Sequence, residues 1–242
     1  MKASGYGSRF IAIAFGPLLF PQSRVVLSHL PTLDEAAGQR YGTIAGLDPM
    51  RLLVFGDSTA AGVGAATQKD ALAGSLARGL HDRFDRGVHW QVHARSGVTS
   101  GELRSFFLPA ATAESYDVIV LSIGVNDVMH LRRKRQFARD LAAILDALRA
   151  ASPDAWILVP GVPRMERFRS LPDPLGSILG ARAHRINRGA RQVIEGRHRV
   201  VHTKPWPIGA PGFFARDDFH PSAVGYAAWA NAALDFWQRR AL

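Results

Sequence analysis

A serine, a histidine and an aspartate occur in this chain where they could act together on a substrate. Ser58 comes three residues after the apolar run 52–55, and near the C-terminus Asp217 and His220 lie three residues apart. One tight turn can therefore deliver the last two side chains to the serine. A serine hydroxyl becomes a good nucleophile when an imidazole takes its proton, and a carboxylate can fix the tautomer of that imidazole. The sequence predicts Ser58 as nucleophile, His220 as base and Asp217 as its orienting group.

Two further residues could donate hydrogen bonds to a developing negative charge. Gly97 follows the strand-like segment 88–93, and Asn126 follows the apolar run 118–123. A glycine lets a backbone N–H approach a substrate closely, and the asparagine amide is itself a donor. Such donors stabilise the oxyanion of a tetrahedral intermediate. Because parallel strands end at one edge of their sheet, we expect both residues near Ser58.

Other polar residues near these positions have simpler interpretations. We expect Asp57 and Asp127 to support their loops by accepting backbone hydrogen bonds, as Asp commonly does in turns. Asp218 is a rival to Asp217 as the partner of His220, but on an extended segment its side chain would point away, which favours Asp217. The remaining histidines have no metal-ligand spacing and the chain has no cysteine, so we expect no metal and no cofactor.

The elements that would position these residues alternate between apolar strands and helix-like stretches. That alternation is typical of a parallel sheet covered by helices on both faces. The sequence therefore predicts an α/β fold, a three-layer α/β/α sandwich around a mainly parallel five-stranded sheet. The expected strands lie near 51–55, 88–93, 117–123, 155–160 and 199–202, and the expected helices near 68–84, 133–150, 175–195 and 222–238.

The first fifty residues lie outside the alternating pattern of strands and helices. The apolar run 10–20 is about half the length needed to span a bilayer, and no small-residue cleavage site follows it. We expect either a segment lying on a membrane surface or an extra helix packed on the domain, and we favour a cytoplasmic or peripheral-membrane location over secretion. Residues 31–50, with several Gly and Pro, are interpreted as a linker. Residues 1–50 would thus be an arm and linker, and residues 51–242 one catalytic domain.

The chain is strongly basic. Its formal net charge is +10, and 26 of its 30 basic residues are arginine. Such a surface favours anionic partners, and the clusters 132–135 and 164–169 each follow an expected strand, near the predicted site. Anionic lipid head groups or acidic substrates could dock there; a plain solvated face is the alternative. No nucleic-acid motif is present and the basic residues are spread along the chain, so we expect no nucleic-acid partner.

These motifs together resemble those of the SGNH (GDSL-type) hydrolases, whose four blocks centre on Ser, Gly, Asn and His. All four occur here in order over roughly residues 51–238. The resemblance implies a flavodoxin-like fold and an oxyanion hole made by the backbone amides of Ser58 and Gly97 and the side chain of Asn126. Two departures are visible: Thr59 replaces the usual leucine of the nucleophile block, and the glycine block lacks the asparagine often found upstream.

The resemblance implies a carboxylic ester hydrolase that forms an acyl-enzyme. Apolar residues in 160–177 and 205–214 would suit an acyl chain, which favours esters of short to medium chain length, small or lipid. Within the family, a carbohydrate O-deacetylase and an acyl thioesterase are the alternatives. From a different class, a noncatalytic basic module that binds membrane or nucleic acid would leave the triad residues coincidental.

Overall fold

A six-stranded sheet forms the centre of the computed structural model, which describes residues 31–241. The apolar run expected to lie on a membrane or to pack on the domain is outside these residues. The strand order is β1-β3-β2-β4-β5-β6, and every neighbouring pair is parallel except β1 with β3. The mainly parallel sheet is therefore confirmed, with six strands in place of five. The strands are β1 (Tyr41–Ile44), β2 (Met50–Gly56), β3 (Val88–Ala94), β4 (Val118–Ser122), β5 (Trp156–Pro160) and β6 (Val200–Thr203).

The additional strand, β1, lies in the stretch that was expected to be a linker. Its register runs from Tyr41 opposite Gln91 to Ile44 opposite Val88, antiparallel to β3. Four residues that include a glycine carry little strand signal, so this segment takes its conformation from the edge of β3. The linker interpretation of residues 31–50 is wrong for this part, because it is hydrogen-bonded into the sheet.

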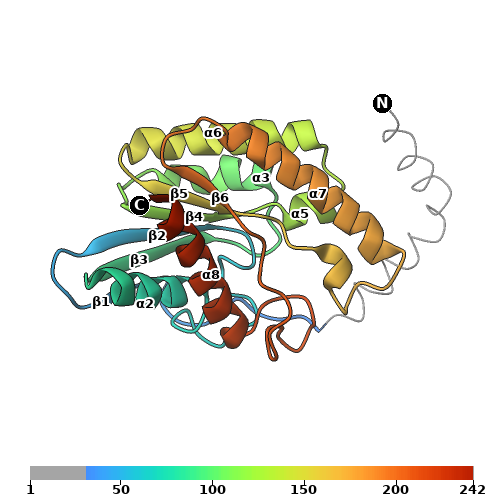
Figure 1. The fold of residues 1–242 in the computed structure, drawn as a ribbon, viewed down its shortest axis with the longest axis horizontal. Coiled ribbons are helices and arrows are strands. Elements are labelled where there is room, and N and C mark those ends of the chain that lie inside the picture. Colours follow the sequence, from blue (N-terminus) through green and yellow to red (C-terminus); the bar gives the residue numbers. More distant parts are fainter. Residues whose placement is uncertain (1–30, 242) are drawn as a thin grey trace.

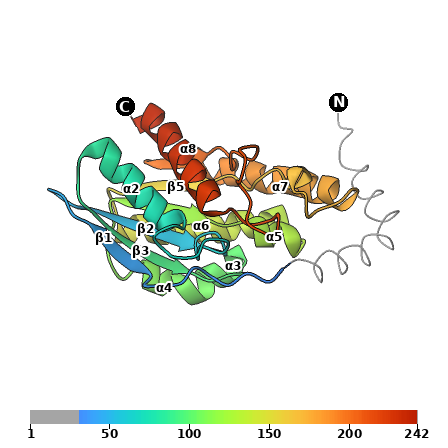
Figure 2. The same ribbon diagram turned by 90° about the horizontal axis from the view of Figure 1, so that it is seen from below.

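Helices cover both faces of the sheet, which confirms the three-layer sandwich (Figures 1 and 2). One face carries α2 (Leu72–Phe84) and α8 (Ala223–Ala241), which pack on each other, and the other carries α6 (Lys134–Ala151) and α7 (Leu175–Ile194). None of the helices within residues 31–241 has both the length and the apolar character needed to cross a bilayer. Shorter elements are α3 (Ser100–Glu102), the π-helical turn η1 (Leu103–Phe107), α4 (Leu108–Ala111), α5 (Val125–Met129) and the 3₁₀ turn η2 (Met165–Arg167).

The strand order places three loops side by side. β2 pairs with β3 on one side and with β4 on the other, and the ends of the three strands are in register, with Gly56 opposite both Ala94 and Ser122. From β2, the chain first adds β3 on one side of the sheet and then crosses to add β4 on the other side. In open α/β sheets, ligands bind at such a switch point, beyond the carboxyl ends of the strands. The loops after these strands carry Ser58, Gly97 and Asn126, so all three lie on this rim.

Candidate active site

The predicted serine, histidine and aspartate form one hydrogen-bonded line. Ser58 Oγ lies 3.0 Å from His220 Nε2, and His220 Nδ1 lies 2.7 Å from Asp217 Oδ2. Asp217 is only 4% exposed and Ser58 8% exposed. An imidazole held in this way can take a proton from the hydroxyl through one nitrogen while the carboxylate accepts from the other.

The loop that carries Asp217 and His220 is built around the aspartate. Asp217 Oδ1 accepts hydrogen bonds from the backbone N–H groups of Phe219 (3.0 Å) and His220 (2.9 Å). This is a turn that Asp forms readily. Burial alone would raise the pKa of Asp217, but the hydrogen bonds from His220 and Phe219 outweigh it and hold the pKa below its ordinary value. The carboxylate therefore stays ionised beside the imidazole.

Asp218 is not the residue that contacts the imidazole. Its backbone has a left-handed conformation, with φ of 51°, and its carbonyl accepts a hydrogen bond from Ser170 Oγ at 3.0 Å. The segment is therefore a tight turn rather than the extended chain that we assumed when weighing Asp218 against Asp217. The turn brings Asp217 back onto His220 three residues later.

The serine loop packs directly on the histidine loop. Gly64 has φ of 98°, and a Cβ at this position would lie 2.3 Å from the Pro221 carbonyl oxygen and 3.3 Å from the His220 Cβ. Only glycine fits so close an approach without a shift of the backbone. Tyr226 of α8 fixes the same loop, since its hydroxyl donates to the Val63 carbonyl at 2.7 Å.

Thr59, which departs from the usual leucine, has a polar role in the structure. Its hydroxyl donates to Asp57 Oδ1 at 2.9 Å and lies 2.6 Å from Ser122 Oγ at the end of β4. The Thr59 backbone N–H also points to Asp57 Oδ1, at 3.2 Å. Asp57 Oδ2 is buried and has no hydrogen-bond partner in the described part of the chain. Burial raises the pKa of Asp57 to about 6, despite the opposing hydrogen bonds from Thr59.

This raised pKa predicts a specific pH dependence of stability for Asp57→Asn. A carboxyl whose pKa is higher in the folded than in the unfolded chain costs stability as it ionises, here as the pH rises from about 4 to about 6. Wild type should lose this stability between those pH values, whereas Asp57→Asn should not. The free energy of unfolding of the variant minus that of wild type should therefore rise by about 3 kcal/mol across that pH range. Urea unfolding of both proteins at several pH values measures the increment. Parallel stability curves would show that Asp57 does not titrate there.

The glycine and asparagine loops are joined to each other. Asn126 Nδ2 donates to the Val98 carbonyl at 3.0 Å, and Asp127 accepts from Ser100 through its backbone N–H at 3.0 Å and its hydroxyl at 2.7 Å. Gly97 is exposed, with φ of 82°. In the part of the chain that the structure describes, the backbone N–H of Gly97 has no acceptor in the protein. This N–H and the second N–H of the Asn126 amide are thus available to a bound molecule.

An ion-pair network behind these loops was missed from the sequence. Arg132 contacts Asp127 at 3.0 Å and Asp140 at 2.8 Å, and both carboxylates are buried. Arg104 also reaches Asp140, at 3.2 Å. These partners come from separate elements, and no pattern in the local sequence predicts that they pair. Breaking a buried pair is costly, so the network holds the Asn126 loop rigid.

One neighbouring feature could have been found in the sequence. The Ser/Thr-x-x-Glu pattern marks the first turn of a helix. Thr99 and Glu102 fit it, and the Thr99 backbone N–H donates to Glu102 Oε2 at 2.9 Å. This pattern would have indicated that a helical turn starts two residues after Gly97.

Most of the aromatic residues that we expected to line an acyl site are packed on one another. Phe168 stacks on Trp206 with ring centroids 5.9 Å apart and meets Phe219 edge-on at 5.1 Å. Phe213 lies beside Trp206 at 6.3 Å. Phe168, Trp206 and Phe213 are buried, whereas Phe219 is only partly so. The cluster therefore ties the loop after β5 to the loop that carries Asp217 and His220.

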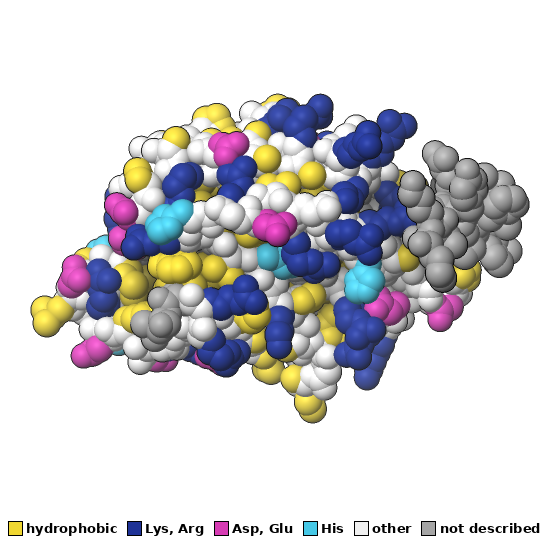
Figure 3. Space-filling view, turned by 45° about the horizontal axis from the view of Figure 1, so that its top comes forward, with side chains coloured by type: hydrophobic (Ala, Val, Ile, Leu, Met, Phe, Trp, Pro, Cys, Tyr) yellow, Lys and Arg dark blue, Asp and Glu magenta, His cyan; other side chains and the backbone are white. Residues whose placement is uncertain are grey.

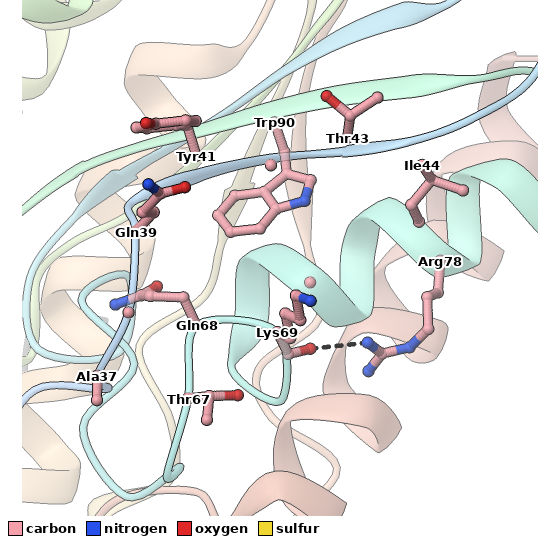
Figure 4. A pocket seen from close by; sticks show the side chains of 13 residues that line it. Ala37, Gln39, Tyr41, Thr43, Ile44, Thr67, Gln68, Lys69, Arg78 and Trp90 are labelled. Atoms are coloured by element: carbon pink, nitrogen blue, oxygen red, sulfur yellow. Dashed lines mark hydrogen bonds between the residues drawn. The ribbon is translucent and has the colours of Figure 1, made fainter.

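A hollow of about 880 Å³ lies elsewhere, between β1 and α2 (Figure 4). Trp90, Tyr41 and Lys69 line it, and none of the predicted site residues does. Across residues 31–241, no three His, Asp or Glu side chains are grouped in a way that could hold a metal ion.

The chain is similar to several known proteins in sequence or in fold. A curated GDSL-like esterase of Mycobacterium tuberculosis is 29% identical over 196 residues; the match covers 75% of this chain, and the chain spans about 60% of that protein's length. A lipase from a goat rumen metagenome has a TM-score of 0.60 and 17% identity, covering 79% of this chain and 97% of its own. A family 3 carbohydrate esterase of Clostridium thermocellum has a TM-score of 0.58 and 18% identity, covering 81% and 100%.

The two solved structures share the fold. The family itself follows from the sequence, because the model of the GDSL-like lipase/acylhydrolase family matches residues 54–228, most of the chain. That range includes every residue of the hydrogen-bonded line from Ser58 to Asp217. This chain belongs to the GDSL-like lipase/acylhydrolase family.

Proposed function

We propose that this protein is a serine ester hydrolase that works through an acyl-enzyme. The observation that carries the proposal is the continuous line from Ser58 Oγ through His220 to Asp217, with spacings of 3.0 Å and 2.7 Å. Family membership supports the same reaction class. A noncatalytic basic module has no need of this geometry.

In the first half of the reaction, Ser58 Oγ attacks the carbonyl carbon of the ester while His220 Nε2 takes the hydroxyl proton. The tetrahedral intermediate then collapses, the bond to the alcohol oxygen breaks, and His220 returns the proton to the departing alcohol. In the second half, His220 takes a proton from water, which attacks the acyl-enzyme, and Ser58 leaves with its proton restored. The ionised Asp217 stabilises the imidazolium that forms in each half.

The oxyanion would be held by three donors on the rim: the backbone N–H groups of Ser58 and Gly97, and Asn126 Nδ2. The free N–H of Gly97 supports this assignment. Asp127 supports it indirectly, because it fixes the Ser100 backbone just after Gly97. Asp57 has a similar supporting role for the serine loop.

Asn126→Ala is expected to lower kcat by roughly 10²- to 10³-fold, the usual loss for one oxyanion donor. The substitution also removes the hydrogen bond to Val98, so the melting temperature of the variant must be measured alongside its kinetics. KM should change little, because the oxyanion exists only after attack. An unchanged kcat in a folded variant would remove Asn126 from the site.

The substrate that the site favours is an ester with a short to medium acyl chain. The buried state of Phe168, Trp206 and Phe213 supports this, because these rings are not open to line the site of a long acyl chain. Acetyl esters of carbohydrates are the second candidate, since the exposed rim at Gly97 could admit a large alcohol and a similar fold is found in a carbohydrate esterase. A thioester would use the same residues.

Hydrolysis of p-nitrophenyl esters from acetyl to palmitoyl tests the proposal, together with labelling by an organophosphonate and peptide mapping. We expect the label on Ser58 and the highest kcat/KM at the short to medium chain lengths. A strict preference for acetyl would favour the carbohydrate candidate, to be checked with acetylated xylan. If neither labelling nor hydrolysis of any oxygen ester or thioester is seen, the protein is not a hydrolase of this type.

A further inference from the structure

A second pocket, of about 230 Å³, lies between the turn that joins α5 to α6 and the helix α7. Five basic side chains and two apolar ones line it, and no acidic side chain does. Lys and Arg side chains gather on this side of the molecule (Figure 3). The basic residues of the lining are Arg132, Arg133, Lys134, Arg182 and Arg185.

Arg182 is placed where its charge is poorly compensated. Its Nη2 donates to the Arg132 carbonyl at 3.0 Å, but its Nε is buried and has no hydrogen-bond partner among residues 31–241. Burial, and then the neighbouring charge of Arg185, lower the pKa of the Arg182 guanidinium. A partly buried cation beside another cation is unfavourable unless an anion joins them.

Arg132 is engaged by the carboxylates of Asp127 and Asp140, whereas three other cations of the pocket lack such a partner within the described part of the chain. Lys134 Nζ donates to the neutral Gln192 side chain at 2.7 Å. Within residues 31–241, no carboxylate forms an ion pair with Lys134, with Arg182 or with the adjacent Arg133. The helix α6 also begins here, and its N-terminal end adds partial positive charge.

An apolar residue stands at the edge of the same pocket. Leu131 is 61% exposed and has φ of 53°, a backbone conformation that residues with a Cβ adopt rarely. Backbone strain of this kind is often found at binding sites. A ligand that suits both features would carry a compact, multiply charged anion next to an apolar portion.

We propose that this pocket binds the phosphate group of an amphiphilic phosphate ester, with Leu131 against the apolar portion. A phosphate offers several acceptor oxygens to guanidinium donors that converge from two elements, and it would supply Arg182 Nε with its missing partner. The phosphate could belong to a phospholipid head group at a membrane surface or to a soluble acylated phosphate. The site is distinct from the serine centre, and binding there requires no turnover.

Titration of the full-length protein with inorganic phosphate at constant ionic strength, followed by its melting temperature, is the first test. We expect a saturable rise for wild type. Arg133→Gln and Arg182→Gln should each raise the apparent Kd at least about fivefold, the loss expected for one charge-assisted hydrogen bond. The matched controls are Arg135→Gln and Arg188→Gln, exposed arginines of the same two helices that do not line the pocket. They should bind phosphate as wild type does.

Arg133 is exposed, so its variant tests the pocket even if Arg182→Gln unfolds. Hydrolysis of p-nitrophenyl acetate should remain unchanged in all four variants, which separates this proposal from that of the ester centre. No saturable effect of phosphate on wild type, or an equal weakening in pocket and control variants, would overturn the proposal.

Cosedimentation with vesicles then distinguishes the two sources of phosphate. Retention on phosphatidylglycerol but not phosphatidylcholine vesicles, weakened by the two pocket variants and not by the controls, would support the phospholipid head group. Vesicle binding that ignores the pocket variants, while the phosphate effect persists, would support a soluble phosphate ester.

Discussion

Ser58→Ala is expected to lower kcat/KM for the best p-nitrophenyl ester by about 10⁴- to 10⁶-fold, the largest effect of any single substitution in this chain. The substitution removes one oxygen atom and creates no clash in a loop whose backbone is held by Asp57 and Tyr226. The variant should therefore fold normally and still bind substrate, so the loss should appear in kcat. Single-turnover measurements with wild type should in addition show a burst of p-nitrophenol if the acyl-enzyme accumulates.

A second serine on the same rim provides the control for this result. Ser96 is exposed and directly precedes Gly97, and its backbone N–H donates to Glu35. Within residues 31–241, its hydroxyl has no hydrogen-bond partner. Ser96→Ala should keep nearly full activity and should still be labelled by an organophosphonate. Comparable activity in Ser58→Ala and wild type would mean that another residue is the nucleophile.

The fold was largely predictable because buried parallel strands leave a strong signal. The cores of β2 and β4 are unbroken apolar runs, at 52–55 and 118–121, and both are fully buried. β1 could not be predicted, because its side chains alternate only between exposed and half-buried and its pairing partners lie 44 to 50 residues away. The start of α2 was placed four residues early, because a Thr67–Asp70 side-chain hydrogen bond holds a turn before the helix.

The candidate site was predictable because its loops follow strands that the sequence indicates clearly. Each of its loops directly follows a strand, so the order of the strands places Ser58, Gly97 and Asn126 on one rim. The contacts that could not be predicted join side chains from different elements, such as Arg132 with Asp140, or Thr59 with Ser122. The raised pKa of Asp57 is of the same kind, since it comes from complete burial, which local sequence does not encode.

Asp217→Asn is expected to lower kcat by about 10⁴-fold while leaving the fold intact, because an amide at this position cannot stabilise the imidazolium and favours the wrong tautomer of His220. The amide oxygen can still accept from the backbone N–H groups of Phe219 and His220, which preserves the turn. Steady-state kinetics at saturating substrate measure the loss.

The neighbouring aspartate makes the comparison decisive. Asp218→Asn alters the charge of the same loop by the same amount, and asparagine tolerates the left-handed backbone found there, so this variant should keep its activity. The two variants should also differ in stability. The lowered pKa of Asp217 contributes stability at pH values above about 4, the ordinary carboxyl value, and that contribution disappears as the pH falls through the folded-state pKa. The stability deficit of Asp217→Asn should therefore shrink in acid. Equal losses of activity in both variants would mean that the charge of the loop matters rather than the contact with His220 Nδ1, and Asp217 would no longer be its orienting group.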